Sequence, residues 1–480
     1  MLARDKTSSV GDAIRSAPER RRTPVPQDLP GRLLASRFGS LITRPWFDRV
    51  VLQVGLAAYI PLSRAWAAAA EAEGDLDRFV AEVPLRRVPP SMERGLRRSL
   101  RRVAELRADH DEMTREWEHV FFAGPAAGPE RLVQIERARR RASDSFMKGR
   151  LAFLPLRLRG LLPAVRFALP KPAEVEARHG ARLANIPGAY LPPDPLPVIK
   201  ESRRIHGLHA VEYWLHYPSG DPAVGESAWA HVFEPVGLKD PPSLIDAHGL
   251  AVEIESLDGV EDGVADLVRM GVRVVRIEAP WHNRRRPPGW YGGEPFLAGP
   301  PLSALDLFSA EVREMAMLVA WCRANSRGRV AVGGTSLGAL ASQLVASHCG
   351  NWPAAYRPDA VFLGTTTDDV GGLSFDSSIA KLIGVPGVLR AAGWTQVQFD
   401  RWRPLTDPIE TPPLDPRDII MVLGTADDVT PFRQGAALAK RWQLPPESLF
   451  LRPMGHFSAA LDLIRDPAPL RRLAERLKRG

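Results

Sequence analysis

The chain has 480 residues, of which 45% are hydrophobic and 25% charged, so it is a globular protein with room for more than one domain. Its net charge of +8 comes from the first part: residues 1–200 carry 35 basic and 23 acidic side chains, and residues 201–480 carry 29 and 33. We find no interleaved aromatic and basic residues, no zinc-knuckle spacing and no basic recognition helix in the sequence. Without such a pattern, the positive charge alone does not imply a nucleic-acid partner, and we expect none.

The cysteine content and the first residues bear on the compartment. Cys322 and Cys349 are too few for a disulfide framework or a four-thiolate metal site. The start, MLARDKTSSV, lacks the apolar stretch of a secretory signal. We therefore expect a cytoplasmic protein, and the basic first part allows peripheral contact with the inner face of the membrane.

The first 182 residues are expected to be helical after a tail. Residues 1–30 are rich in Pro and Arg and predict disorder, and residues 31–182 predict a helical region. Within it, the stretch 91–119 places four apolar residues on one helical stripe: Leu96, Leu100, Val103 and Leu106. Such a stripe packs on a protein core or lies on a membrane, and core packing is the commoner outcome.

The most apolar run, residues 50–60, is too short to cross a membrane. Pro61 and Arg64 follow it, well short of the roughly 20 residues that a spanning helix needs. We expect this run to be buried or peripheral.

A proline-dense segment, 183–198, precedes a different pattern that extends to the C-terminus. Strand-like runs at 201–217 and 228–236 are followed by short apolar runs near residues 243, 272, 329, 359, 418 and 448. Helical patterns lie between and after them, at about 260–270, 303–325, 337–349, 431–443 and 469–479. The alternation predicts a mostly parallel sheet with helices on both faces, and ligands of such sheets bind beyond the carboxyl ends of the strands.

A candidate nucleophile stands at one of the predicted strand-to-helix junctions. Gly334-Thr335-Ser336-Leu337-Gly338 fits the pattern G-x-S-x-G, in which the serine is held on a sharp turn between a strand and a helix. In that arrangement an acid follows a later strand, and a histidine follows the next one. The segment GTADDVTP supplies Asp427, with Asp428 as the alternative acid, and MGHFSA supplies His456.

The motifs GGTSLG, GTADDVTP and MGHFSA, in this order, resemble those of the alpha/beta hydrolase superfamily. The resemblance covers residues 183–480, and EAPWHNRRRP, AYLPPDPLP and GHFSA are particularly similar to a little-characterised branch of the alpha/beta-hydrolase domain-containing proteins. It implies an α/β hydrolase fold with a mostly parallel central sheet, helices on both faces and a helical cap, to which this chain adds its N-terminal helical region.

The resemblance also implies a serine hydrolase site. Ser336 would attack an acyl carbonyl, His456 would take its proton, and Asp427 would orient the imidazole. The backbone N–H groups of Leu337 and Leu250 would form the oxyanion hole, with Leu250 in the loop DAHGLAV. We expect neither metal nor organic cofactor.

Residues near the expected site mouth are candidates for substrate binding. Gly249 would let the backbone approach the substrate, and His248 beside it would shape the loop. Trp281 and His282 begin the segment WHNRRRPPGWYGG, where His282 and Arg284–Arg286 would either contact an anionic head group or form an exposed basic loop, the latter being the commoner arrangement.

The segment 367–415 is too long for a plain connection between strands. Its apolar residues predict a helical cap over Ser336, or equally an insertion packed away from the site.

Three functions fit these residues. The first is a serine hydrolase acting on a small-molecule or lipid ester or thioester. The second is a catalytically silent protein of the same fold that serves as a binding or scaffolding module, and the third is an acyltransferase that uses the same three residues.

Overall fold

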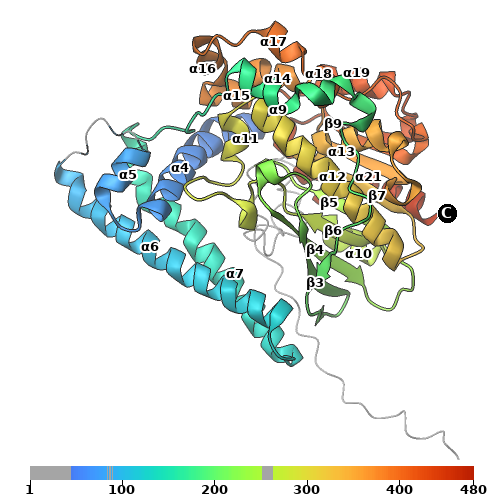
Figure 1. Cartoon of the computed structure of the whole chain (residues 1–480), viewed down its shortest axis with the longest axis horizontal. Coiled ribbons are helices and arrows are strands. Elements are labelled where there is room, and N and C mark those ends of the chain that lie inside the picture. Colours follow the sequence, from blue (N-terminus) through green and yellow to red (C-terminus); the bar gives the residue numbers. More distant parts are fainter. Residues whose placement is uncertain (1–44, 84, 86–87, 89, 251–262, 480) are drawn as a thin grey trace, which may run out of the picture.

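A computed structural model of the chain describes residues 45–83, 85, 88, 90–250 and 263–479. The predicted disordered tail, residues 1–30, lies outside these residues, as does the start of the predicted helical region. Figure 1 shows a central sheet flanked by helices, with a set of N-terminal helices extending to one side.

The predicted strand pattern forms one mixed sheet. Among the described residues the strand order is β1-β3-β4-β6-β5-β7-β8-β9-β10, and β2 pairs with β3. Strands β5 to β10 are mutually parallel, whereas β3 and β4 pair antiparallel and β4 joins β6 antiparallel. The strands are β1 Lys200–Glu201, β2 Ile205–His206, β3 Ala210–Pro218, β4 Ser227–Pro235, β5 Ser243–Ala247, β6 Arg273–Ile277, β7 Val330–Thr335, β8 Ala360–Gly364, β9 Ile419–Gly424 and β10 Leu449–Arg452.

Alternate residues of the central strands enter two different cores, because side chains of a strand point to opposite faces. In β7, Val330 and Val332 join the larger core, and Ala331 joins the smaller one. The larger core contains apolar residues of α12 (Leu302–Asn325) and α13 (Leu337–His348), and the smaller one contains those of α10 (Gly263–Arg269) and α21 (Ala468–Lys478). Two further helices follow late strands, α19 (Phe432–Arg441) and α20 (His456–Leu461). Helices therefore cover both faces of the sheet.

Apart from the first of them, the N-terminal helices contribute apolar residues to the larger core. They are α3 Pro45–Val50, a π-helical stretch η1 Val51–Leu56, α4 Ala57–Ala72, α5 Leu76–Glu82, α6 Pro90–Glu118, α7 Pro129–Lys148, α8 Leu154–Leu158 and α9 Pro172–Ala184. The stripe of α6 is buried, with Leu100 and Val103 fully inaccessible. This is the core-packed alternative, so the stripe has no apolar face left for a membrane. Among the described helices, none combines the length and the apolar character needed to cross a bilayer.

Helix α4 continues beyond the proline that follows the apolar run. Pro61 lies inside α4, and Arg64 one turn later is completely buried. The charged residue that follows the apolar run in the sequence is thus an interior residue with a partner, described below.

Five short helices lie between β8 and β9, within the long segment 367–415. They are α14 Val370–Asp376, α15 Ser378–Ile383, α16 Val385–Ala391, α17 Gln396–Asp400 and α18 Arg403–Thr406. Figure 1 shows them gathered at one end of the molecule.

Candidate active site

Ser336 lies on a strained turn between β7 and α13. Its φ of 54° and ψ of −119° are unusual for a residue with a side chain, and the backbone is held by hydrogen bonds on both sides. The Ser336 N–H donates to the Gly364 carbonyl at 2.8 Å, and the Leu340 N–H donates to the Ser336 carbonyl at 3.0 Å. The turn leaves Ser336 half-buried at the carboxyl end of the strand.

The two glycines that flank the turn are required by space. A Cβ at Gly334 or at Gly338 would lie 2.2 Å from the carbonyl oxygen of Ala247, the last residue of β5. The turn that carries Ser336, called the elbow below, thus has its backbone in contact with the neighbouring strand. Only glycine permits so close an approach.

Ser336, His456 and Asp427 are joined by hydrogen bonds. The distance from Ser336 Oγ to His456 Nε2 is 2.9 Å, and that from His456 Nδ1 to Asp427 Oδ2 is 2.8 Å. A carboxylate can only accept a hydrogen bond, so we assign the proton of the neutral His456 ring to Nδ1, which donates it to Asp427. The unprotonated Nε2 then accepts the hydrogen bond from the Ser336 hydroxyl. His456 is 4% exposed and Asp427 7%. Ser336 follows β7, Asp427 follows β9 and His456 follows β10. The carboxyl ends of these three parallel strands lie at the same edge of the sheet.

The alternative acid points elsewhere. Asp428 is exposed, and its carboxylate accepts a hydrogen bond from Ser378 Oγ at 2.9 Å. Of the two aspartates, only Asp427 contacts the imidazole.

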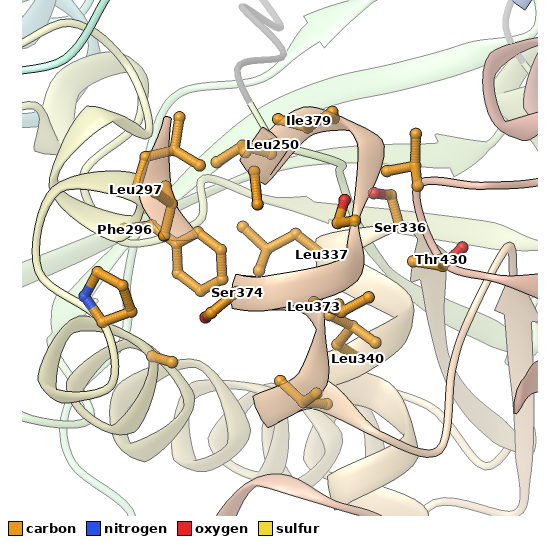
Figure 2. Close-up of a pocket in the computed structure, with 17 residues that line it drawn as sticks. Leu250, Phe296, Leu297, Ser336, Leu337, Leu340, Leu373, Ser374, Ile379 and Thr430 are labelled. Carbon is orange, nitrogen blue, oxygen red and sulfur yellow. The ribbon is translucent and has the colours of Figure 1, made fainter. Parts of the chain in front are cut away.

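An apolar cavity of about 100 Å³ opens beside Ser336. Figure 2 shows Ser336 and Thr430 at one side of it and Phe296 and Leu297 across from them. The first half of the 367–415 segment closes the cavity, with seven residues in its lining: Val370, Leu373, Ser374, Ser377, Ile379, Ala380 and Val385. The second half packs elsewhere, since Trp394 is buried and donates from Nε1 to the Pro170 carbonyl at 3.0 Å.

Comparisons with known proteins give distant structural likenesses only. No family model and no curated protein matches the sequence. Among solved structures, a cold-adapted esterase from an Arctic intertidal metagenomic library is 14% identical, with a TM-score of 0.37 over 57% of this chain and 98% of that one. Acetyl xylan esterase 1 from Thermoanaerobacterium sp. is 16% identical, with a TM-score of 0.39 over 62% and 96%. An S-formylglutathione hydrolase from Agrobacterium tumefaciens is 15% identical, with a TM-score of 0.37 over 57% and 98%. At these values the likenesses carry no inference about activity.

The architecture of the chain itself decides the fold. A parallel sheet from β5 to β10 carries an elbow serine after β7, an aspartate after β9 and a histidine after β10, in the chain order that this fold uses. This chain has the α/β hydrolase fold.

Leu337 and Leu250, whose backbone N–H groups the sequence predicts as oxyanion donors, both line the cavity beside Ser336. Leu337 is the first residue of α13, so its N–H has no carbonyl partner within the helix. Leu250 follows β5 and lines the cavity with Ser336 and Leu337. Both residues therefore lie next to Ser336 in the cavity wall, and their role as oxyanion donors stays a prediction.

His248 holds the loop that presents Leu250. Its Nε2 accepts the Ala279 N–H at 3.1 Å, so Nδ1 carries the ring proton and donates to the Gly249 carbonyl at 2.8 Å. The Gly249 carbonyl and the Leu250 N–H belong to one planar, trans peptide unit, in which they point in opposite directions. The hydrogen bond from His248 to this carbonyl therefore also fixes the direction of the Leu250 N–H. Burial, together with the nearby His282, lowers the pKa of His248 to about 3, which keeps this ring neutral.

The predicted substrate-binding residues lie outside the cavity lining. Gly249, Trp281 and His282 are not among the described residues that line it. His282 is completely buried, and its Nδ1 donates to the Pro280 carbonyl at 2.9 Å. Burial lowers the pKa of His282 to about 4, so the ring is neutral at pH 7. It lies in the protein interior and offers no positive charge to an anionic head group.

The expectation of an exposed basic loop was wrong. Arg285 is 8% exposed, and its guanidinium makes a two-pronged ion pair with the Glu314 carboxylate, both distances being 2.7 Å. Arg284 pairs with Glu278 and packs over the ring of Trp117, 4.7 Å from its centroid. Arg284 is held by a carboxylate of its own segment, whereas the carboxylate that holds Arg285 comes from α12, 29 positions later, and a contact of that kind leaves no local pattern.

Sequence reasoning also missed several residues of the site. Thr430 donates from Oγ1 to Asp427 Oδ2 at 2.9 Å, and its proximity to Asp427 in DDVTP is the one local signal for it. Phe296 and Leu297 of α11 (Glu294–Ala298) line the cavity without any motif. Among the described residues, no cluster of three or more His, Cys, Asp or Glu side chains is placed to hold a metal ion.

Proposed function

We propose that this protein is a serine hydrolase that cleaves a carboxylic ester or thioester with an apolar acyl group. The observation that carries the proposal is the continuous set of hydrogen bonds Ser336–His456–Asp427, which ends at a hydroxyl facing an apolar cavity. The strained elbow supports it, because strain of this kind is retained where a side chain must be held in one position.

The reaction would proceed through an acyl-enzyme. His456 Nε2 takes the proton of Ser336 Oγ as the oxygen bonds to the acyl carbon, and Asp427 stabilises the imidazolium. The resulting oxyanion accepts hydrogen bonds from the N–H groups of Leu337 and Leu250, each worth about 3 to 4 kcal/mol of barrier. His456 then protonates the leaving alcohol or thiol as its bond to the acyl carbon breaks. Water, deprotonated by the same histidine, releases the acid and restores Ser336.

The cavity lining bears on the substrate class. Its side chains are mainly Leu, Ile, Val, Ala and Phe, which favours an apolar acyl chain. A lipid ester is the natural extension of this proposal. The apolar stripe of α6 gives membrane contact no support, because it lies in the core.

Covalent labelling tests the nucleophile. We expect a fluorophosphonate probe to label the wild-type protein and not Ser336→Ala, since the probe reacts only with a serine activated by a base. Ser378→Ala is the matched control, because that hydroxyl is bonded to the Asp428 carboxylate and not to a histidine. A wild-type protein that does not react, or a Ser336→Ala variant that reacts equally, would contradict the proposal and leave the silent scaffold.

Product analysis separates hydrolysis from acyl transfer. In the proposed reaction water is the nucleophile of the second step, and an added alcohol or amine would compete with it for the acyl-enzyme. Incubation of an ester with the enzyme and an added alcohol or amine should yield the free acid as the main product. A dominant acyl–acceptor product would instead assign the transferase.

A further inference from the structure

A carboxylate from the N-terminal region lies at the start of the helix that carries His456. Asp48 belongs to α3 and is 5% exposed. Its Oδ1 accepts the Phe457 N–H at 2.6 Å and the Ser458 N–H at 3.1 Å, and its Oδ2 accepts the Ser458 hydroxyl. These bonds join residues 409 and 410 positions apart in the chain.

The helix that receives this carboxylate has no cap of its own. Helix α20 spans six residues, His456–Leu461, and the first N–H groups of a helix have no partner within it. The capping position is Gly455, which has no side chain to accept these donors. Asp48 supplies the missing acceptor, and its negative charge suits the positive end of the helix dipole.

Gly455 is glycine because Asp48 occupies its side-chain position. A Cβ at Gly455 would lie 2.5 Å from Asp48 Cγ. The φ of Gly455 is −87°, which any residue adopts, so its backbone conformation does not require glycine. The glycine before His456 is therefore explained by the approach of α3.

The position of His456 depends on this first turn, of which it is the first residue. Its Nε2 must stay within hydrogen-bonding reach of Ser336 Oγ, at 2.9 Å, while Nδ1 stays on Asp427. A helix of fewer than two turns without a cap frays at its end. A displacement of about 1 Å in such a site costs on the order of 100-fold in rate.

We propose that Asp48 is a positioning residue for His456: by capping α20 from the N-terminal region, it holds the imidazole between Ser336 and Asp427. The proposal rests on the proposed function for its catalytic consequence. It makes the N-terminal segment a part of the active site, although that segment lies outside the sheet and its crossover helices.

The test compares Asp48→Ala with a matched control at a temperature where both are folded. We expect Asp48→Ala to lower the second-order rate constant of fluorophosphonate labelling by about 10- to 100-fold. Asp48→Asn keeps an oxygen that accepts the same N–H groups, and should lose less than Asp48→Ala. Asp75→Ala removes a carboxylate that caps α5 through the Arg78 N–H at 2.8 Å, away from the sheet, and should change labelling less than twofold.

Hydrogen exchange gives a second readout that needs no activity. The peptide covering Gly455–Leu461 should exchange faster in Asp48→Ala than in wild type, and its exchange should be unchanged in Asp75→Ala. Should Asp48→Ala prove unstable, the intermediate behaviour of Asp48→Asn in both measurements provides the same evidence.

The outcomes separate this proposal from the proposed function. Labelling of Asp48→Ala at the wild-type rate, or an equal loss in Asp75→Ala, overturns the positioning role and leaves the hydrolase intact. A wild-type protein that is not labelled overturns the hydrolase, and exchange of the 455–461 peptide then decides alone: faster exchange in Asp48→Ala supports the capping of α20 by Asp48, and unchanged exchange overturns it.

Discussion

Asp427 is the most constrained side chain of the site. Oδ1 accepts the N–H groups of Val429 and Thr430, at 2.9 and 3.0 Å, and Oδ2 accepts from Thr430 Oγ1 and His456 Nδ1. Four donors hold the carboxylate in one orientation, so it can fix the imidazole tautomer that the proposed reaction needs. An exposed carboxylate such as Asp428 has no comparable restraint.

Exchanging the acid for its amide tests this role. Asp427→Asn should lower kcat towards a p-nitrophenyl ester by about 10⁴-fold with little change in KM, because the amide stabilises the wrong tautomer. Asp428→Asn is the matched control and should stay within about twofold of wild type. Circular dichroism would verify that both variants are folded. A larger loss of kcat in Asp428→Asn than in Asp427→Asn would show that the acid is misassigned.

At the scale of elements, a buried ion pair joins the N-terminal helices to the cavity wall. Arg64 of α4 donates from Nη1 to Glu294 Oε2 at 2.9 Å, and both side chains are essentially inaccessible. Glu294 also accepts the Arg166 N–H at 2.9 Å and is the first residue of α11, which carries Phe296 and Leu297 into the cavity. Burial raises the pKa of Glu294, and the charge of Arg64 opposes that rise.

Removing the cation of this pair should destabilise the protein. We expect Arg64→Ala to lower the free energy of unfolding by about 3 to 5 kcal/mol, because it leaves the Glu294 carboxylate buried without its partner. Arg97→Ala removes the cation of an exposed pair with Glu93, 2.8 Å apart, and should cost less than about 1 kcal/mol. Urea denaturation measures both, and similar losses in the two variants would contradict the distinction.

At the scale of the whole molecule, α12 holds a buried acidic group that has no hydrogen-bond partner in the part of the chain that the structure describes. Glu311 is completely buried, and no donor among the described residues reaches either of its carboxylate oxygens. Nearby Arg285 is engaged by Glu314. Burial, followed by the charge of Glu314, raises the pKa of Glu311 well above its ordinary value of 4.5, so folding favours its protonated form.

This group should make folding stability fall as pH rises. Above pH 4.5 the unfolded chain releases the Glu311 proton while the folded chain retains it, until the pH reaches the raised native pKa. In that pH window, the free energy of unfolding of Glu311→Gln minus that of the wild type should increase by about 1.4 kcal/mol per pH unit. Near pH 4 this difference should not change with pH.

Chemical denaturation at a series of pH values measures this difference. Glu314→Gln provides the contrast, since it leaves buried Arg285 without its carboxylate and should destabilise at neutral pH. A constant difference between Glu311→Gln and wild type from pH 4 to pH 8 would refute the titration.

The sequence by itself determined the elements that depend on local pattern. The alternation of apolar runs with helical periodicity located strands β5 to β10 and helices such as α12 and α13. Burial on both faces leaves a continuous apolar run in central strands such as β8 and β9. The G-x-S-x-G turn and the later strand ends located Ser336, Asp427 and His456, because their spacing along the chain follows the order of the strands.

Only the tertiary structure decided which distant segments meet. Asp48 caps α20 across more than 400 positions, Arg64 pairs with Glu294, and Arg285 lies inside the protein and not in an exposed loop. No local pattern marks these contacts, because a charged residue reads as exposed until its partner is known. Burial of a charge depends on a partner brought near by the folded chain, and that partner is set by the packing of the whole molecule.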